Sequence, residues 1–274
     1  MIRGLRRIGE LFSKRKQLGL RFSELVYLYI DKHIPTVFGV LDYPRVQIRL
    51  MVNGAIDILR LSSVSKEPET VEWLEDRIKP GSVLYDIGAN VGAYSLIAGA
   101  LGKGRAHVFA IEPSFTNFYS LSRNVLRNNL QNCVQPLYIA LSNTSGTQKL
   151  FFSHIDSGAA KHSIGTSAQG DSAQLYMQVP ITTFDLMIES YGLPAPTLIK
   201  IDVDGFEYEV VKGAGKTLSL PDLKSVLIEI DLDSEHGKEI EQLILSHGFA
   251  LTARHPRSRG QSNRIFNYIF DRVS

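Results

Sequence analysis

One stretch constrains the fold more than any other: an apolar run that passes through two glycines into a second apolar run. The first run covers residues 83–87, Gly88 and Gly92 follow it, and the second covers 93–101. This order is typical of a buried strand, a tight loop and a helix in an α/β sheet. The glycines allow a sharp turn and leave room for a ligand to approach the backbone. The N-terminus of the helix offers free N–H groups to a carboxylate, so the sequence predicts a binding loop here.

The spacing within this loop indicates the kind of ligand. Asp86 ends the predicted strand, where its carboxylate can accept hydrogen bonds from a cationic group. The loop reads Gly-x-Asn-x-Gly, whereas Gly-x-Gly-x-x-Gly binds the pyrophosphate of a dinucleotide. The loop therefore suits a zwitterionic amino acid better than a diphosphate.

Acidic residues end three further predicted strands. Glu112 follows strand 107–111, and an acidic residue there binds the ribose hydroxyls in nucleotide-binding sheets. Asp202 follows strand 197–201, and Glu229 lies near the end of strand 226–230. Because the carboxyl ends of central strands border the ligand crevice of an open α/β sheet, we expect all three at one site.

The segment after Asp202 has a second interpretation. Asp204 and Glu207 have the spacing of a capping box, so Asp204 either begins the helix 207–212 or belongs to the site.

Three segments resemble the FkbM-type family of class I S-adenosylmethionine-dependent methyltransferases. The first reads Asp-Ile-Gly-Ala-Asn-Val-Gly-Ala-Tyr-Ser from residue 86 and continues to Ala-Ile-Glu-Pro-Ser from residue 110. The second reads Lys-Ile-Asp-Val-Asp-Gly-Phe-Glu from residue 200, with Asp204 where the family has Glu. The third is Thr-Thr-Phe-Asp from residue 182, with Phe184 where the family has Leu. The resemblance covers about residues 83–230 and implies an α/β/α sandwich around a seven-stranded, mostly parallel sheet.

The resemblance implies S-adenosylmethionine as cofactor, with the adenine beside the end of the third strand, 134–140. The residues predicted to bind it lie in the first loop or at the next two strand ends: Asp86, Gly88, Ala89, Asn90, Gly92, Tyr94, Ser95, Glu112, Ala140 and Leu141. The residues predicted to be catalytic are Asp202, Glu229 and His162, which lies in a long loop between the predicted strands 148–152 and 175–181.

Two mechanisms remain open for the proton of the acceptor hydroxyl. Asp202 and Glu229 together can hold a Mg²⁺-like ion that lowers the pKa of the hydroxyl. Alternatively, one carboxylate is a general base, assisted by His162. We favour the reaction without metal and assign no metal ligand, because methyl transfer can proceed with late loss of the proton.

The family resemblance implies O-methylation of a sugar, glycan or polyketide hydroxyl. Two alternatives are a nicotinamide-dependent oxidoreductase, disfavoured by the glycine spacing, and a non-catalytic protein that binds the cofactor and acts as an interaction module.

The distribution of charge along the chain argues against nucleic acid as a partner. Residues 1–34 contain eight Lys or Arg against three acidic residues, which gives +5 and leaves −3 for the rest of the chain, whose net charge is +2. The basic loop 254–264 either is solvated or borders an anionic substrate.

The remaining predictions concern the basic N-terminal segment and the cellular compartment of the protein. We expect residues 1–66 to form a basic extension of helices and a β-hairpin, with strands 46–52 and 55–62 around Asn53-Gly54. Residues 67–274 are the predicted methyltransferase domain. The N-terminal helix either lies on an anionic membrane surface or is solvated. Cys133 is the only cysteine, and no apolar run is long enough to span a bilayer, so we expect a cytoplasmic protein, peripheral to the membrane at most.

Overall fold

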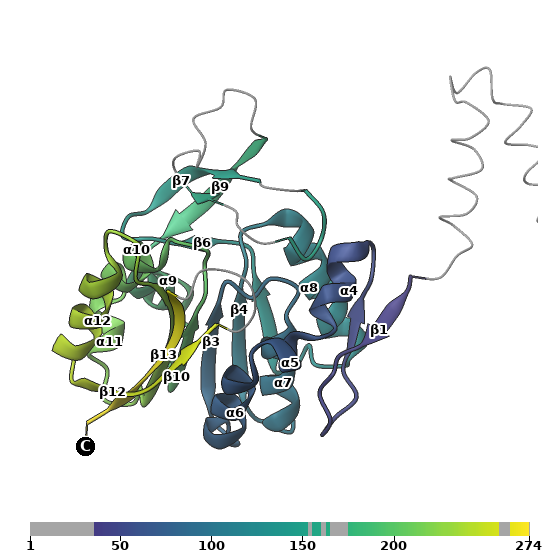
Figure 1. The fold of residues 1–274 in the computed structure, drawn as a ribbon, viewed down its shortest axis with the longest axis horizontal. Coiled ribbons are helices and arrows are strands. Elements are labelled where there is room, and N and C mark those ends of the chain that lie inside the picture. Colours follow the sequence, from purple (N-terminus) through teal and green to yellow (C-terminus); the bar gives the residue numbers. More distant parts are fainter. Residues whose placement is uncertain (1–35, 153–154, 160–162, 165–174, 258–263, 274) are drawn as a thin grey trace, which may run out of the picture. The chain divides into compact units, whose positions relative to one another are not determined.

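A computed structural model describes residues 36–273 of the 274-residue chain, apart from 153–154, 160–162, 165–174 and 258–263 (Figure 1). Residues from Phe38 onward form one compact unit. His162 and the N-terminal helices predicted before residue 35 lie outside the described residues. None of the described helices is long and apolar enough to cross a membrane.

The described residues confirm the expected central sheet of seven strands. Its spatial order is β12-β13-β11-β10-β3-β4-β5. The five strands from β11 to β5 run parallel, and β13 is antiparallel to both of its neighbours, β11 and β12. The strands are β3 (Val83–Ile87), β4 (His107–Ile111), β5 (Val134–Leu137), β10 (Leu198–Ile201), β11 (Ser225–Asp231), β12 (Phe249–Pro256) and β13 (Ile265–Arg272).

Helices cover both faces of this sheet, and its central strands are therefore buried on both faces (Figure 1). Along β3, Leu84 packs into one core cluster, and Tyr85 and Ile87 pack into the other. The first cluster includes α6 (Pro68–Arg77), α7 (Ala93–Leu101) and α8 (Phe115–Arg127). The second includes α9 (Phe184–Tyr191), α10 (Glu207–Lys212), α11 (Gly215–Leu218) and α12 (Gly237–Ser246). The α/β/α sandwich is therefore confirmed.

The predicted hairpin around Asn53-Gly54 is wrong. The segment after Gly54 is a helix, α4 (Ala55–Arg60), followed by α5 (Ser63–Lys66), and β2 (Arg49–Met51) pairs instead with β1 (Phe38–Val40). Asp57 explains the difference, because its Oδ2 accepts hydrogen bonds from the backbone N–H of Asn53 (2.8 Å) and Gly54 (3.2 Å). Gly54 is extended, at φ −161°, whereas the tight hairpin turn needs a positive φ.

The predicted third strand, 134–140, is divided between two sheets. It ends at Leu137 in the central sheet, and β6 (Ala140–Leu141) joins a second sheet of order β6-β9-β7-β8. The other strands of this sheet are β7 (Gly146–Phe151), β8 (Ser163–Ile164) and β9 (Tyr176–Thr182). The backbone of β6 pairs with Ile181 and Thr182 of β9, which turns the chain away from β4. The second sheet thereby closes one side of the cleft described next.

Candidate active site

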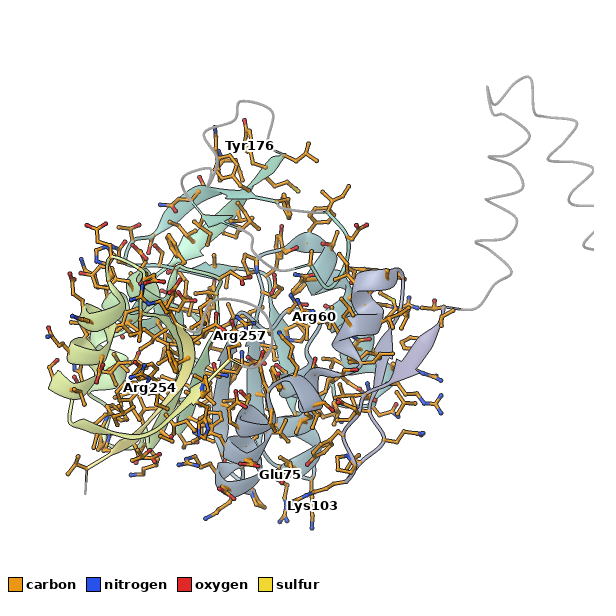
Figure 2. The ribbon with its side chains drawn as sticks, viewed as in Figure 1. Arg60, Glu75, Lys103, Tyr176, Arg254 and Arg257 are labelled. Carbon is orange, nitrogen blue, oxygen red and sulfur yellow. The ribbon has the colours of Figure 1, made fainter. Side chains whose placement is uncertain are left out.

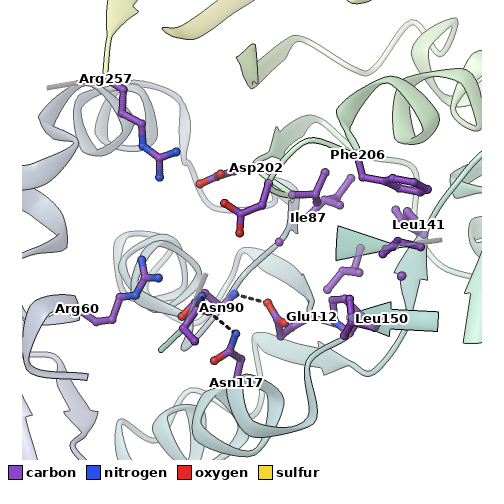
Figure 3. Close-up of a pocket in the computed structure, with 18 residues that line it drawn as sticks. Arg60, Ile87, Asn90, Glu112, Asn117, Leu141, Leu150, Asp202, Phe206 and Arg257 are labelled. Atoms are coloured by element: carbon purple, nitrogen blue, oxygen red, sulfur yellow. Dashed lines mark hydrogen bonds between the residues drawn. The ribbon is translucent and has the colours of Figure 1, made fainter. Parts of the chain in front are cut away.

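The carboxyl ends of β3, β4 and β10 border a cleft (Figure 3). The strand register produces this edge. Ile201 aligns with Ile87 on one side and Ile228 on the other, so Asp202, Gly88 and Glu229 lie at the same level of the sheet, although β11 continues to Asp231.

Glu112 lies at the middle of this cleft, as predicted for a ribose ligand. Only 5% of its surface is exposed. Its Oε2 accepts a hydrogen bond from the backbone N–H of Asn90, and its Oε1 accepts one from Ser114, both at 2.8 Å. Burial raises the pKa of Glu112 to about 7, despite these hydrogen bonds. Two backbone donors therefore fix the carboxylate, and its remaining lone pairs can accept hydrogen bonds from a ligand.

An apolar wall lies beyond Glu112. Ala140 and Leu141, predicted beside the adenine, belong to the lining, and sequence reasoning missed the other wall residues, Leu150, Ile164 and Phe206. Figure 3 shows Leu141, Leu150 and Phe206 on the side of Glu112 away from Arg60 and Arg257. This end of the cleft suits a flat aromatic base next to a sugar.

The two glycines of the loop are required by packing within the protein itself. A Cβ on Gly88, which has φ +82°, would lie 1.8 Å from the backbone oxygen of Asp202. A Cβ on Gly92, which has φ +90°, would lie 2.4 Å from Leu121. The positive φ angles agree with the predicted sharp turn, and the two close approaches are a further reason for glycine at these positions. Gly88 borders the cleft, but its small size lets β3 and β10 end side by side.

Asn90 and Asn117 connect the loop to residues 155–159. The side-chain nitrogens of both donate to the backbone oxygen of Ala159, at 2.9 and 3.0 Å. The side-chain oxygen of Asn117 accepts from the N–H of Gly158 at 2.8 Å. Asn117 was not predicted, although a pattern marks it: polar residues at helical spacing occupy the buried face of α8 at 117, 120 and 124. Buried polar side chains at core-facing positions need partners, and here they hold this segment beside the cleft.

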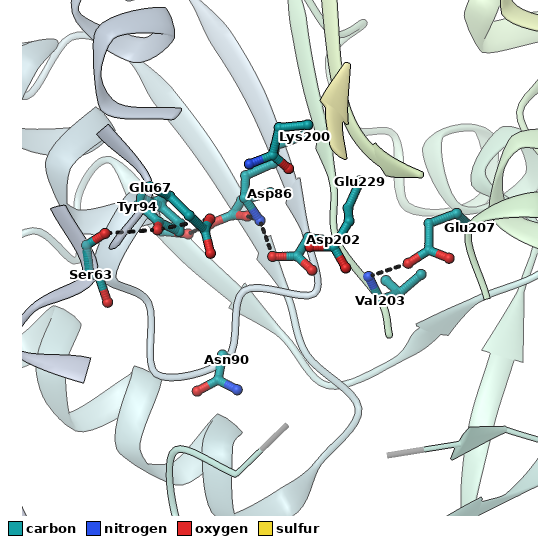
Figure 4. A network of polar contacts seen from close by, with 12 residues as sticks. Ser63, Glu67, Asp86, Asn90, Tyr94, Lys200, Asp202, Val203, Glu207 and Glu229 are labelled. Carbon is teal, nitrogen blue, oxygen red and sulfur yellow. Dashed lines mark hydrogen bonds and ion pairs between the residues drawn. The ribbon is translucent and has the colours of Figure 1, made fainter. Parts of the chain in front are cut away.

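Asp86 and Ser95 lie beneath the loop and do not line the cleft. Ser95 Oγ donates to Asp86 Oδ2 at 2.5 Å. Lys200 aligns with Asp86 in the sheet, and its Nζ lies 3.3 Å from Asp86 Oδ1 and 3.5 Å from Asp202 Oδ2 (Figure 4). Lys200 is only 2% exposed. Asp86 therefore neutralises the buried Lys200, which in turn contacts Asp202. The sequence analysis predicted instead that Asp86 contacts the cofactor directly.

Asp202 and Glu229 have pKa shifts of opposite sign. Burial raises the pKa of Glu229 to about 9, and the neighbouring charge of Asp202 adds to this effect. Burial acts in the same direction on Asp202, but the charges of Lys200 and Arg257 outweigh it and lower the pKa of this carboxyl. Asp202 is therefore the more acidic of these two neighbouring carboxyl groups. Such a division between two carboxyl groups is typical of catalytic sites.

Arg257 and Glu67 complete this network; the sequence analysis named the basic segment that contains Arg257 and missed Glu67. Arg257 forms an ion pair with Glu229 and lies 3.5 Å from Glu67. Glu67 also accepts a hydrogen bond from the hydroxyl of Tyr94 at 2.9 Å. The Tyr94 ring lies 5.3 Å from Lys200 Nζ. The basic loop predicted from residue 254 therefore reaches the site through Arg257.

A second cavity adjoins the cleft at Gly88, Asn90, Asp202 and Arg60, which line both. The other residues of its lining come from the loop, from β10 and from α5 and its C-terminal end: Ser63, Lys66, Glu67, Ala89, Val91, Ala93, Tyr94 and Lys200. The predicted residues Ala89 and Tyr94 thus face this cavity. In the described residues, no group of three or more His, Cys, Asp or Glu is arranged to hold a metal ion.

Glu207 has a structural role that replaces the predicted capping box. Its carboxylate accepts hydrogen bonds from the backbone N–H of Val203 and Gly205, both at 3.1 Å. Asp204 has φ +56° and precedes the N-cap, Phe206, so it does not begin the helix. Asp204 lines the cleft instead.

Comparison with known proteins decides the family. The Methyltransferase FkbM domain matches residues 86–251, more than half of the chain. The chain belongs to the FkbM methyltransferase family. It is an S-adenosylmethionine-dependent methyltransferase with the class I fold.

Curated relatives of this FkbM family member are methyltransferases. The hexuronic acid methyltransferase AglP of Haloferax volcanii is 31% identical over 182 residues, which cover 66% of this chain and 70% of that protein. The 31-O-demethyl-FK506 methyltransferase FkbM of Streptomyces tacrolimicus is 28% identical over 201 residues, covering 64% and 75%. The methyltransferase sdnD of Sordaria araneosa is 25% identical over 193 residues, covering 62% and 74%.

The residues of the cleft fit the cofactor of this family. Glu112 supplies a fixed carboxylate for two ribose hydroxyls, and the wall around Leu141 supplies an apolar surface for the adenine. The ionised Asp202 suits the cationic sulfonium, a charge that S-adenosylhomocysteine lacks. S-adenosylmethionine supplies an activated methyl group when bound, so the protein has to orient an acceptor and manage one proton.

Proposed function

We propose that this methyltransferase transfers a methyl group to a hydroxyl of a sugar, glycan or polyketide-like small molecule. The observation that carries the proposal is the ionised Asp202 at the same sheet edge as Glu112, between the cofactor cleft and the second cavity. An acceptor hydroxyl beside Asp202 would face the methyl-bearing end of a nucleoside held at Glu112.

In this proposal the two carboxyl groups have different tasks. Asp202 is the general base, which accepts a hydrogen bond from the acceptor hydroxyl and takes its proton as the methyl group transfers. Lys200 keeps Asp202 ionised, because its buried ammonium lies 3.5 Å away. Glu229 forms an ion pair with Arg257, which holds it in place beside Asp202. The predicted assistance by His162 stays a prediction, and so does the reaction without metal.

The relatives support an oxygen acceptor and leave the choice between acceptors open. One is named for hexuronic acid, and another for 31-O-demethyl-FK506. Membership of a methyltransferase family argues against the nicotinamide-dependent oxidoreductase and the non-catalytic interaction module considered from the sequence.

The test is methyl transfer with S-adenosylmethionine that carries a ¹³C-labelled methyl group. The acceptor panel contains hexuronides, neutral glycosides and an O-demethylated macrolide. We expect one S-adenosylhomocysteine for each methyl ether or ester formed, with the label bound to oxygen. Transfer of the label to nitrogen or carbon, or cofactor binding without transfer to any acceptor, would contradict the proposal.

A further inference from the structure

The arrangement of the cleft indicates where the methionine end of the cofactor binds. The apolar wall around Leu141 suits the adenine, and Glu112 suits the ribose hydroxyls. From the ribose, S-adenosylmethionine continues in the direction away from its adenine. Figure 3 shows Arg60 and Leu141 on opposite sides of Glu112. The methionine end therefore extends towards Gly88, Asn90 and Arg60, where the cleft adjoins the second cavity.

Four cationic side chains line the cleft or the second cavity, and three of them are paired with carboxylates. The pairs are Lys200 with Asp86 and Asp202, Lys66 with Glu67, and Arg257 with Glu229 and Glu67. The fourth cation is Arg60, which lines both cavities. It has no carboxylate within ion-pair distance in the described part of the chain. Among these four, Arg60 is thus the cation whose charge is left for an anionic ligand.

A neutral oxygen holds Arg60 in position. Its Nε and Nη2 donate to the backbone oxygen of Gly158, at 2.8 and 2.6 Å, and its Nη1 makes no hydrogen bond to another described residue. Gly158 is fixed in turn, because its N–H donates to Asn117. The next backbone oxygen, that of Ala159, accepts from Asn90 in the glycine loop. The guanidinium is therefore oriented beside this loop while its charge stays uncompensated.

Further contacts attach α4 and α5 to the domain and so determine where Arg60 lies. Arg60 is the last residue of α4, and its backbone oxygen accepts from Ser63 Oγ at 2.7 Å. The hydroxyl of Tyr94, in the first turn of α7, lies 3.1 Å from the backbone oxygen of Ser63 and 2.9 Å from Glu67. Both helices precede residues 86–251, which match the family domain. A segment before the matched domain thus brings a cation to the glycine loop.

We propose that Arg60 binds the carboxylate at the methionine end of S-adenosylmethionine by a charge-assisted hydrogen bond, and that the second cavity holds this end of the cofactor. Arg60 then makes the site selective for a cofactor that carries the carboxylate. A domain boundary at residue 66, as predicted from the sequence, would separate this ligand from the rest of the cofactor site. The inference goes beyond the proposed function, because it concerns the cofactor and holds for any acceptor.

The test is calorimetry on the full chain with two ligands that differ only in the carboxylate. They are S-adenosylhomocysteine and its decarboxylated analogue, and neither can donate a methyl group. We expect the unmodified protein to bind S-adenosylhomocysteine roughly ten- to a hundred-fold more tightly than the analogue, the scale of a charged hydrogen bond. In Arg60→Gln most of this preference should disappear, while the affinity for the analogue stays the same.

Three further variants locate the cause of the preference. Arg60→Lys keeps the positive charge but not the planar fork that reaches Gly158, and it should show an intermediate preference. Lys66→Gln removes a second cation of the same cavity, one that contacts Glu67, and should keep most of the preference. Arg254→Gln is the matched control and should change neither affinity, because Arg254 is exposed on β12 and lines neither cavity (Figure 2).

The outcomes distinguish this inference from a structural role and from the proposed function. Equal binding of the two ligands by the unmodified protein would overturn it. An equal loss of affinity for both ligands in Arg60→Gln would also overturn it, because Arg60 would then only support Gly158. A preference that persists in Arg60→Gln and is lost in Lys66→Gln would assign the carboxylate to Lys66 instead. None of these results bears on methyl transfer to oxygen, which the acceptor panel tests separately.

Discussion

The two ends of the cleft are built in different ways. At the nucleoside end, Glu112 is fixed by two backbone N–H groups from its own loop and the neighbouring one, beside an apolar wall. At the reaction end, Asp202 is held by side chains, with Lys200 in contact and Arg257 nearby. Hydrogen bonds from backbone N–H groups persist as long as the fold does, whereas a network of ion pairs is disrupted when any one of its side chains is replaced. We therefore expect substitutions at the two ends to affect different properties of the enzyme.

The largest effect is expected on stability, from Lys200→Met. This change leaves the buried Asp86 and the partly buried Asp202 without their shared cation, and removing one partner of a buried ion pair typically costs about 3–5 kcal/mol. The free energy of unfolding is measured by urea denaturation. The control is Arg77→Met, which removes a partly exposed ion pair with Asp271 and should cost less than about 1 kcal/mol. Similar losses in the two variants would show that the buried network contributes no more than a surface pair.

The next effect is on catalysis, from Asp202→Asn. Loss of the general base should reduce turnover by roughly 10²-fold or more. Turnover is measured as the rate of S-adenosylhomocysteine release in the presence of an acceptor that the unmodified protein methylates. Glu209→Gln, a half-buried position on α10 that lines neither cavity, is the control and should keep normal turnover. Near-normal turnover of Asp202→Asn would remove Asp202 from the chemistry and leave the reaction end as a structural network.

The smallest effect is a pH dependence of cofactor affinity, confined to the nucleoside end. Burial raises the pKa of Glu112 to about 7, so in the free protein this carboxyl takes up a proton between pH 8 and pH 6. Ribose hydroxyls donate to the ionised form, and affinity for S-adenosylhomocysteine should therefore fall as pH falls, by at most about ten-fold per unit below 7. Calorimetry at several pH values measures this. The dependence should be absent in Glu112→Gln, and its persistence there would assign the titration to another group.

The difference between the two ends also explains how much the sequence could predict. The strand, the glycine loop and the acidic strand ends are local patterns, and the structure confirms the seven-stranded sheet and places Glu112 and Asp202 in the cleft. Arg60, Glu67 and Arg257 meet only in the folded chain, so no local pattern marks them. The hairpin predicted at Asn53-Gly54 failed for a related reason: Asp57, four residues after Asn53, binds the backbone groups of the turn and begins a helix.

One paired measurement tests the central claim, that the cleft separates cofactor binding from proton transfer. Calorimetry with S-adenosylhomocysteine is carried out on Glu112→Ala and Asp202→Asn, after denaturation curves have shown that both variants fold. We expect Glu112→Ala to lose about 1.5–3 kcal/mol of binding free energy, the scale of charged hydrogen bonds, and Asp202→Asn to bind almost as the unmodified protein does. Unchanged affinity in Glu112→Ala, or an equal loss in both variants, would contradict this division of the cleft.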